Sequence, residues 1–244
     1  MHDGERRVIA ALWSLQGVGC KTIARLRERF GDLSSLLREP VRRWASEIEW
    51  TPRAQATLAQ VETLEPHADA LTSNLKKLGH EAVFPGDSGW PPLLRCIDRC
   101  PPILFRWGET NQLRPARRVA VVGSRHPETG VTTRVTSLCR ELGHVGIATV
   151  SGAAEGVDQS AHFGSLEAGV ETWAYLGSAL DRMESAQRKL IRPFFDGRGV
   201  FYSEFPPGTR ASRTTFPRRN RLISASADAT LIVRAGESSG ALFW

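Results

Sequence analysis

The chain has 244 residues, of which 41% are hydrophobic and 24% charged, and this ordinary composition excludes a chain that is disordered throughout. Its formal net charge of +6 favours a polyanionic partner. Residues 1–30 carry Arg6, Arg7 and acids where a signal peptide needs an apolar stretch, and the sequence has no run of 18 apolar residues, which argues for a cytoplasmic protein with no membrane partner.

Residues 1–78 have the pattern of a small all-helical domain. Apolar residues such as Val8, Leu12 and Leu15 recur at helical spacing, and no strand pattern interrupts them. Between two of the expected helices, residues 15–22 carry two glycines and a lysine, and this hairpin is similar to that of a SAM or helix-hairpin-helix module. Backbone N–H groups at such glycines can approach a phosphate, but helix packing also needs a glycine turn. Both explanations stay open.

The proline-rich residues 84–108 predict a linker with short ordered pieces. After it, apolar runs typical of strands alternate with amphipathic segments. The expected strands are residues 119–122, 147–150, 172–176, 199–203 and 230–233. This alternation predicts a Rossmann-like α/β domain over residues 79–244, with a mostly parallel sheet and helices on both faces.

The first candidate site follows strand 119–122, at the end of the sheet where open α/β folds bind ligands. Gly123 permits close approach of a backbone, Ser124 can donate a hydrogen bond, and Arg125 can hold a phosphate through two N–H groups. A strand followed by Gly-Ser occurs in many α/β proteins, so this segment alone is a weak indication of phosphate binding.

The second candidate site is the glycine loop after strand 147–150. Ser151, Gly152 and Gly156 would bring loop amides and a helix N-terminus to an anion. Asp158 could cap that helix or bind a ligand, and His162 follows one turn later, where the two side chains could meet. Such a pair is more often structural than catalytic. Since no serine or cysteine accompanies it in a nucleophile motif, we expect no catalytic residue.

The third candidate site is a basic segment, in which Arg218, Arg219 and Arg221 surround Asn220. Pro217 is typical of a first helical turn, so the arginines are expected beside the positive end of a helix that ends near residue 227. Solvation alone does not require three arginines in four residues. The segment therefore predicts an anion-binding surface.

The four cysteines predict neither disulfides nor a metal site. They are spaced too widely for a paired zinc motif, and a reducing compartment would keep them as thiols. We expect free thiols, no metal and no cofactor at Cys20, Cys96, Cys100 and Cys139.

Several ordered motifs resemble one known family. Residues 151–166 match S-G-x-A-x-G-x-D-x-x-A-H-x-G-A-L except at Ser165, residues 203–208 match S-E-x-P-x-G, and residues 216–223 match F-P-x-R-N-R-x-I. The V-V-G-S-R of residues 121–125 and the pair 239–240 follow the same order. The chain thus resembles the DNA-processing protein A family, DprA/Smf, over nearly its whole length.

This resemblance implies an extended Rossmann fold that forms a homodimer, binds single-stranded DNA in a basic pocket and hands DNA to the RecA recombinase in natural transformation. Arg125 would contact the DNA, a second basic position falls on Lys189 beside Arg188, and the motif arginines fall on Arg219 and Arg221. The residues that we expect to bind DNA or phosphate are Gly123, Ser124, Arg125, Ser151, Gly152, Gly156, Arg188, Lys189, Arg218, Arg219, Asn220, Arg221, Ser239 and Gly240.

The chain also departs from the family pattern. Glu155 stands at a frequent arginine position, residues 183–185 replace a Tyr-Pro, Arg188 replaces an asparagine, and Arg234 replaces a glutamate. The sequence ends at Trp244, before the family's last helix and strand. We therefore expect a truncated or divergent member, or a member whose exposed C-terminal edge is covered by another protein.

Two other classes of protein stay open. The glycine loops and Arg125 would also suit one mononucleotide, as in a nucleotide-binding sensor or hydrolase, although Glu155, Asp158 and Glu204 show no partner for general acid and base catalysis. A scaffold subunit of a bacterial DNA-related or defence complex would explain the early end of the sheet.

Overall fold

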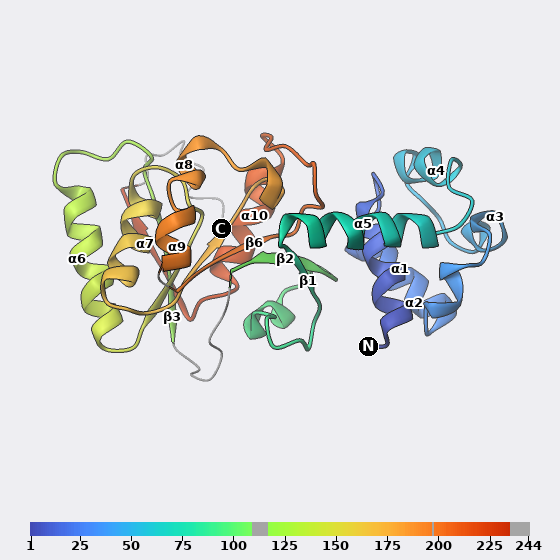
Figure 1. The fold of residues 1–244 in the computed structure, drawn as a ribbon, viewed down its shortest axis with the longest axis horizontal. Coiled ribbons are helices and arrows are strands. Elements are labelled where there is room, and N and C mark those ends of the chain that lie inside the picture. The colour runs from blue at the N-terminus through green and yellow to red at the C-terminus, as the bar shows by residue number, and fades with distance from the viewer. Residues whose placement is uncertain (109–116, 197, 235–244) are drawn as a thin grey trace. The chain divides into compact units, whose positions relative to one another are not determined.

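The computed structural model describes residues 1–108, 117–196 and 198–234 (Figure 1). These residues form two units. The first unit contains Met1–Pro85 and Asp98–Leu104, and the second contains Gly86–Ile97 and the described residues from Phe105 onward. The sequence placed the boundary between residues 78 and 79. In the structure, residues 79–85 belong with the helices before them.

The first unit is helical apart from one short strand. Its elements are α1 (Asp3–Ser14), α2 (Cys20–Phe30), η1 (Ser34–Leu37), α3 (Val41–Trp44), η2 (Ala45–Glu47), α4 (Pro52–Leu58), α5 (Glu65–Leu78) and β1 (Glu81–Val83). Val8, Ile9 and Leu12 of α1 are fully buried, as are Leu26 of α2 and Leu33. The helical pattern expected over this region is therefore confirmed, and apolar burial supplies the core.

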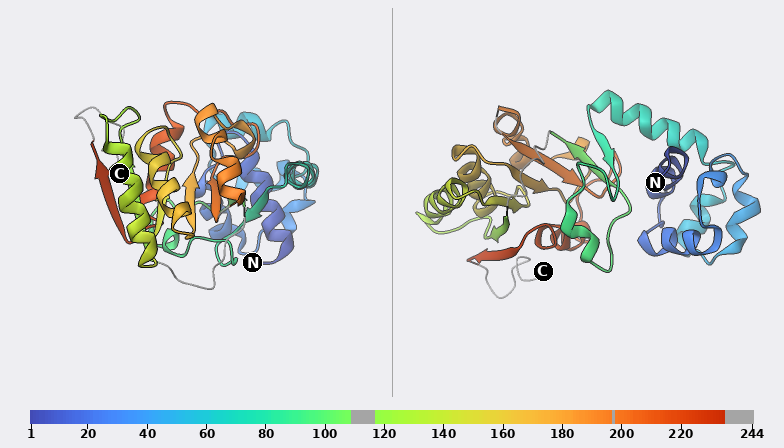
Figure 2. Two further views of the ribbon diagram at one scale, coloured as in Figure 1. Left: turned by 60° about the vertical axis from the view of Figure 1, so that its left-hand side comes forward. Right: turned by 90° about the horizontal axis from the view of Figure 1, so that it is seen from below.

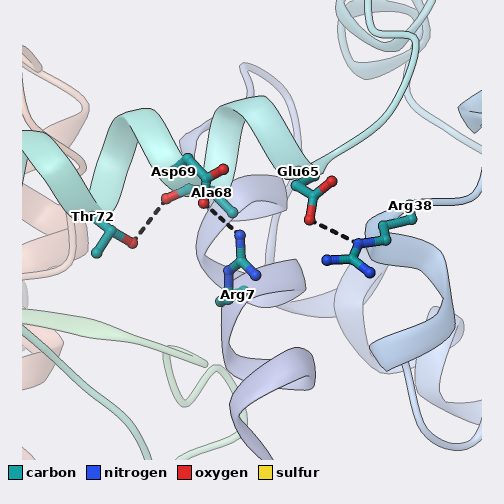
Figure 3. Close-up of polar contacts among 6 residues, drawn as sticks. All are labelled: Arg7, Arg38, Glu65, Ala68, Asp69 and Thr72. Atoms are coloured by element: carbon teal, nitrogen blue, oxygen red, sulfur yellow. Dashed lines mark hydrogen bonds and ion pairs between the residues drawn. The ribbon is translucent and has the colours of Figure 1, made fainter.

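Helix α5 is tied to its neighbours in this unit by exposed ion pairs (Figure 3). Arg7 of α1 pairs with Asp69, and Nε of Arg38 lies 2.8 Å from Oε1 of Glu65. Exposed pairs of this kind contribute about 0 to 1 kcal/mol each. The buried apolar face of α5, which includes Leu71, therefore stabilises the contact more than the ion pairs do.

The hairpin between α1 and α2 packs on the start of α4. Gly17 has a φ of +85°, and a Cβ there would lie 2.6 Å from the backbone nitrogen of Ala54. The hydroxyl of Thr51 donates to the carbonyl of Gly17 over 3.3 Å. Helix packing thus explains Gly17. Gly19, the N-cap of α2, has open space around it.

The second unit is built on a mostly parallel sheet. Its strands are β2 (Leu104–Trp107), β3 (Arg118–Gly123), β4 (Ala148–Ser151), β5 (Thr172–Tyr175), β6 (Gly199–Ser203) and β7 (Ala229–Val233). They lie in the order β2-β6-β5-β4-β3-β7. β2 is antiparallel to β6, with Phe105 opposite Ser203, and the strands from β6 to β7 are parallel to one another. The five strands expected from the sequence are confirmed.

Helices cover both faces of this sheet (Figure 2). The helices of the unit are η3 (Pro92–Cys96), α6 (Val131–His144), α7 (Val157–Glu167), η4 (Leu180–Arg182), α8 (Ser185–Arg188), α9 (Ile191–Asp196) and α10 (Thr215–Ser224). On one face, Val121 of β3 packs with Ala161 of α7 and Cys139 of α6. On the other, Tyr175 of β5 shares a 2.6 Å hydrogen bond with Ser226, just after α10. The Rossmann-like α/β fold is therefore confirmed.

Helix α10 begins earlier than Pro217 suggested. Ser212 and Thr215 exchange hydrogen bonds, from each backbone N–H to the other side-chain oxygen, over 2.8 and 3.3 Å. These bonds satisfy donors at the start of the helix. The basic residues consequently lie inside the helix, which ends at Ser224, three positions before the expected end.

Two general properties bear on function. Across residues 1–108, 117–196 and 198–234, no helix is both long and apolar enough to span a membrane. The four cysteines are free thiols, and burial raises the pKa of the Cys139 thiol to about 12, so this side chain belongs to the apolar core.

Candidate nucleic-acid interface

The predicted site segments meet at the carboxyl edge of the sheet in the second unit. Strands β3, β4, β5 and β6 are parallel and end there at Gly123, Ser151, Tyr175 and Ser203. In an open parallel sheet this edge is the usual place for a ligand, because loops and helix N-termini gather at it. Helix α10 brings the basic segment to the same edge through a hydrogen bond from Arg219 to Tyr175.

The loops after β3 and β4 are packed backbone to backbone. Gly156 has a φ of +79°, and a Cβ there would lie 2.5 Å from the carbonyl oxygen of Ser124 and 2.6 Å from that of Arg125. The amide of Val157 donates to the Ser124 carbonyl over 3.2 Å. Gly123 likewise has no room for a side chain, since a Cβ there would lie 2.0 Å from the carbonyl oxygen of Val233. The close approach of neighbouring backbone therefore requires glycine at both positions.

Asp158 organises the loop after β4. Its carboxylate accepts hydrogen bonds from the amides of Gly152, at 3.1 Å, and Ala154, at 3.3 Å. The N-cap of α7 is Gly156, so the expectation that Asp158 caps this helix is wrong. The side chain turns back to the preceding loop because its amides offer unpaired donors. These amides, which the sequence suggested for an anion, are thus bonded within the protein.

Arg219 is buried beneath the edge. It reaches from α10 to the end of β5, where its Nη1 donates to the carbonyl of Tyr175 over 2.7 Å, and its guanidinium lies against Gly152. Burial lowers the pKa of Arg219 while the charge of Asp158 opposes that shift. Burial likewise raises the pKa of Asp158 against the charge of Arg219. Each group therefore compensates the buried charge of the other.

Arg125 is exposed and lies over an aromatic ring. Its guanidinium carbon is 5.3 Å from the ring centroid of Phe216, and that of Arg219 is 6.0 Å from the same ring. Gly177 lies against this ring, because a Cβ there would be 2.9 Å from Cδ1 of Phe216. Within the part of the chain that the structure describes, no acidic side chain pairs with Arg125. Its charge is thus directed to solvent.

Two other arginines of α10 share one buried acid. Oε2 of Glu204, just after β6, lies 2.5 Å from Nη2 of Arg221 and 3.6 Å from Nη2 of Arg218. The carboxylate is fully buried, whereas the side chains of Arg218 and Arg221 are 52% and 26% exposed. Burial raises the pKa of Glu204, and the two arginines oppose that shift. Arg218 also lies over the ring of Phe205, 5.1 Å from its centroid.

The basic pair of the α8 region borders the same loop. Nζ of Lys189 is 3.4 Å from Oε1 of Glu155, and both side chains are exposed. Nε of Arg188 donates to the carbonyl of Met183 over 3.1 Å. Helix α8 begins with a capping box of Glu184 and Gln187, so the segment that departs from the family's Tyr-Pro still has a defined turn.

Other candidates from the sequence are turned inward or lie outside the described residues. The hydroxyl of Ser151 donates to the carbonyl of Val121 over 2.5 Å, and Asn220 is buried. Ser239 and Gly240 lie outside the described residues. The sequence drew attention to the arginines, and it offered Phe216 as a possible stacking surface and Glu204 as a possible acid or base, but it did not assign these two residues as partners of the arginines. The position of Glu204 immediately before an acid-free arginine segment was the available signal.

His162 is buried away from Asp158. Its Nδ1 shares a 2.7 Å hydrogen bond with the hydroxyl of Thr172, and its ring meets that of Phe194 edge-on, 5.2 Å between centroids. Burial lowers the pKa of His162 to about 3, so the ring is neutral at physiological pH. The His–Asp contact considered from the sequence is therefore not formed, and His162 joins the polar contacts between α7 and the sheet.

The fold and this edge define a Rossmann-type α/β protein with an arginine-rich, partly aromatic surface at the carboxyl ends of its strands. A family model described as DNA recombination-mediator protein A matches residues 81–243. The chain belongs to this family, and the DprA/Smf resemblance is confirmed.

Curated relatives and solved structures agree with this assignment. The chain is 29% identical to the Smf protein of Synechocystis over 99% of its own length and 61% of that protein, and 26% identical to DprA of Bacillus subtilis over 78% and 64%. It thus spans less than two thirds of their lengths. A structure of Helicobacter pylori DprA, solved to study its single-stranded DNA binding mode, matches with a TM-score of 0.59 and 26% identity, over 67% of this chain and 73% of that one. Streptococcus pneumoniae DprA matches in fold, with a TM-score of 0.62 and 24% identity, over 93% and 82%.

Proposed function

We propose that the chain binds single-stranded DNA at the carboxyl edge of its sheet and acts by binding, without catalysis. The observation that carries this proposal is the exposed guanidinium of Arg125, which lies over Phe216 and is paired with no acidic side chain among the described residues. A cation beside an aromatic ring suits a sugar-phosphate strand, which offers anionic oxygens and bases that stack. The relative from Helicobacter pylori, whose structure concerns single-stranded DNA, supports the choice of ligand.

The basic residues of the edge divide into two roles. Arg125 makes the main phosphate contact, and the exposed side chains of Lys189, Arg188 and Arg218 extend the positive surface around it. Arg219 is buried and bonded to Tyr175, so it fixes the loops and the Phe216 ring rather than gripping a phosphate directly. This division follows from exposure, because a phosphate in water reaches only the guanidinium groups at the surface.

We also propose, on the family resemblance, that the chain works as a cytoplasmic homodimer and hands its DNA to the RecA recombinase. Light scattering on the purified protein should give twice the mass of one chain. RecA filaments should form faster on DNA coated with a single-strand-binding protein when the chain is added. A monomer with no effect on RecA would contradict this part of the proposal and leave DNA binding intact.

Titration of a labelled single-stranded oligonucleotide at several salt concentrations tests the binding itself. The logarithm of the affinity should fall with the logarithm of salt by about 0.7 for each phosphate neutralised. Arg125→Ala should weaken binding and reduce that slope by about 0.7. The matched control is Arg140→Ala, because Arg140 pairs with Glu167 at the far end of α7 and should leave the slope unchanged.

Three results would reject the proposal. They are a flat salt response, equal behaviour of the two arginine variants, and tight binding of a mononucleotide without binding of the oligonucleotide. The last result would favour the nucleotide sensor considered from the sequence.

A further inference from the structure

Glu204 holds two of the three arginines in the basic segment of α10. Its Oε2 contacts Nη2 of both Arg221, at 2.5 Å, and Arg218, at 3.6 Å. The carboxylate itself has no exposed surface, while both arginines reach solvent. A phosphate that approaches α10 from solvent therefore meets guanidinium groups whose inner sides are already bonded to an anion.

The charge of this trio differs from what the sequence suggests. Arg218, Arg221 and Glu204 together carry one net positive charge, although the segment that follows Glu204 contains arginines and no acid up to Ala227. A buried carboxylate is screened by salt much less than an exposed one, because counterions cannot approach it. Its field on the arginines therefore persists under the conditions in which exposed pairs such as Lys189 with Glu155 are weakened.

We propose that Glu204 is an internal counter-anion that limits the affinity of this edge for nucleic acid and keeps Arg221 from contacting a phosphate. The proposal rests on the proposed DNA binding. Arg221 is bonded over the shorter distance and is half as exposed as Arg218, so it positions α10 against β6 and leaves the phosphate contacts to Arg125 and Arg218. Glu204 thereby allows a strand to be held and released, as a protein that passes DNA onward requires.

An alternative role for Glu204 predicts the opposite effect of its removal on the affinity for DNA. If the carboxylate only held arginines in the orientation that DNA needs, its removal would weaken binding. Glu204→Gln keeps the size of the side chain and an oxygen that accepts from Arg221, and it removes the negative charge. Under the present proposal, this variant should bind the oligonucleotide several-fold more tightly, with a salt slope steeper by up to about 0.7.

Glu167→Gln is the matched control, because it makes the same change in net charge at the far end of α7, where Glu167 pairs with Arg140. It should leave the affinity and slope within error of the wild type. Thermal unfolding of each variant, followed by circular dichroism, checks that the fold is retained.

The double variant Glu204→Gln/Arg221→Gln tests the role of Arg221. It can also be measured in place of the single variant Glu204→Gln if that variant folds poorly. It removes one anion and one cation together, so its salt slope should equal that of the wild type. A slope lower by about 0.7 would show that Arg221 binds a phosphate and would overturn the proposal.

The outcomes separate this inference from the function on which it rests. A wild-type chain that does not bind the oligonucleotide overturns both. A wild-type chain that binds through Arg125, with weaker or unchanged binding in Glu204→Gln, overturns only the role of Glu204.

Discussion

The guanidinium of Arg219 fills the space that a side chain at Gly152, just after β4, would need, since a Cβ built on Gly152 would lie 1.8 Å from Nη1 of Arg219 and 2.5 Å from its Cζ. The glycine therefore admits the guanidinium to its bond with Tyr175. A residue chosen in the sequence for close approach to a phosphate thus makes close contact with an arginine of the same protein.

Gly152→Ala should expel Arg219 from its buried position. The methyl group overlaps Nη1, and overpacking of this kind costs about 1–3 kcal/mol, with further loss if Arg219 no longer compensates the buried charge of Asp158. Urea unfolding should show a lower midpoint, and oligonucleotide binding should weaken because Phe216 and Arg125 lose their support. Gly19→Ala, at an N-cap with open space, should cost less, at most about 1 kcal/mol, because it loses only the preference for glycine over alanine at that position. Equal stability of the two variants would show that the Arg219 side chain can adopt another conformation without loss of stability.

Asp158→Asn should destabilise the second unit strongly. Asn cannot neutralise Arg219, and an uncompensated buried charge costs about 3–5 kcal/mol. The matched change is Asp196→Asn, which breaks the exposed pair with Arg192 and should cost less than about 1 kcal/mol. Urea unfolding of both variants measures the difference. A loss below about 1 kcal/mol for Asp158→Asn would mean that Tyr175 and solvent satisfy Arg219 without the carboxylate.

Phe216→Leu should weaken DNA binding with little change in fold. Leucine keeps an apolar side chain against Gly177 and removes the ring on which Arg125 lies. A cation over an aromatic ring contributes about 0.5–1 kcal/mol at an exposed site, which corresponds to a loss of affinity of about two- to fivefold. The oligonucleotide titration measures it, with Phe163→Leu on α7 as the control. If both variants bind as the wild type does, the ring does not orient Arg125.

His162 should make the protein sensitive to acid. Burial lowers its pKa from the ordinary value of about 6.5 to about 3 in the folded state, so between these pH values the unfolded chain binds a proton that the folded chain does not. The stability that neutral His162 contributes is therefore fully present above pH 6.5 and is lost as the pH falls toward 3. The loss between pH 7 and pH 5 is about 2 kcal/mol.

His162→Gln gives the comparison for this prediction. The variant should start from a lower stability but lose less on acidification, because glutamine does not titrate. Urea unfolding at the two pH values measures both slopes. If the free energy of unfolding fell equally with pH in the variant and the wild type, the acid sensitivity would come from other groups.

The sequence predicted where the site lies in the fold better than it predicted the side-chain contacts within the site. Apolar runs such as residues 119–122 identify buried strands, and the carboxyl ends of parallel strands must share one edge, so the places of Arg125 and the glycine loops followed. Which arginine each partner holds could not be predicted. Glu204 is 17 positions from Arg221, and only the packing of α10 on the sheet brings them together. Local patterns carry no information on which of several arginines is buried.

The contact of Gly156 with the carbonyl oxygens of Ser124 and Arg125 leaves no room for the two loops to slide past each other. A strand of DNA would thus meet an edge whose shape is already set, and little conformational entropy would be lost in ordering it. Under the proposed function, recognition at this edge would accordingly be closer to lock-and-key than to induced fit, and its rate would be governed by diffusion and charge.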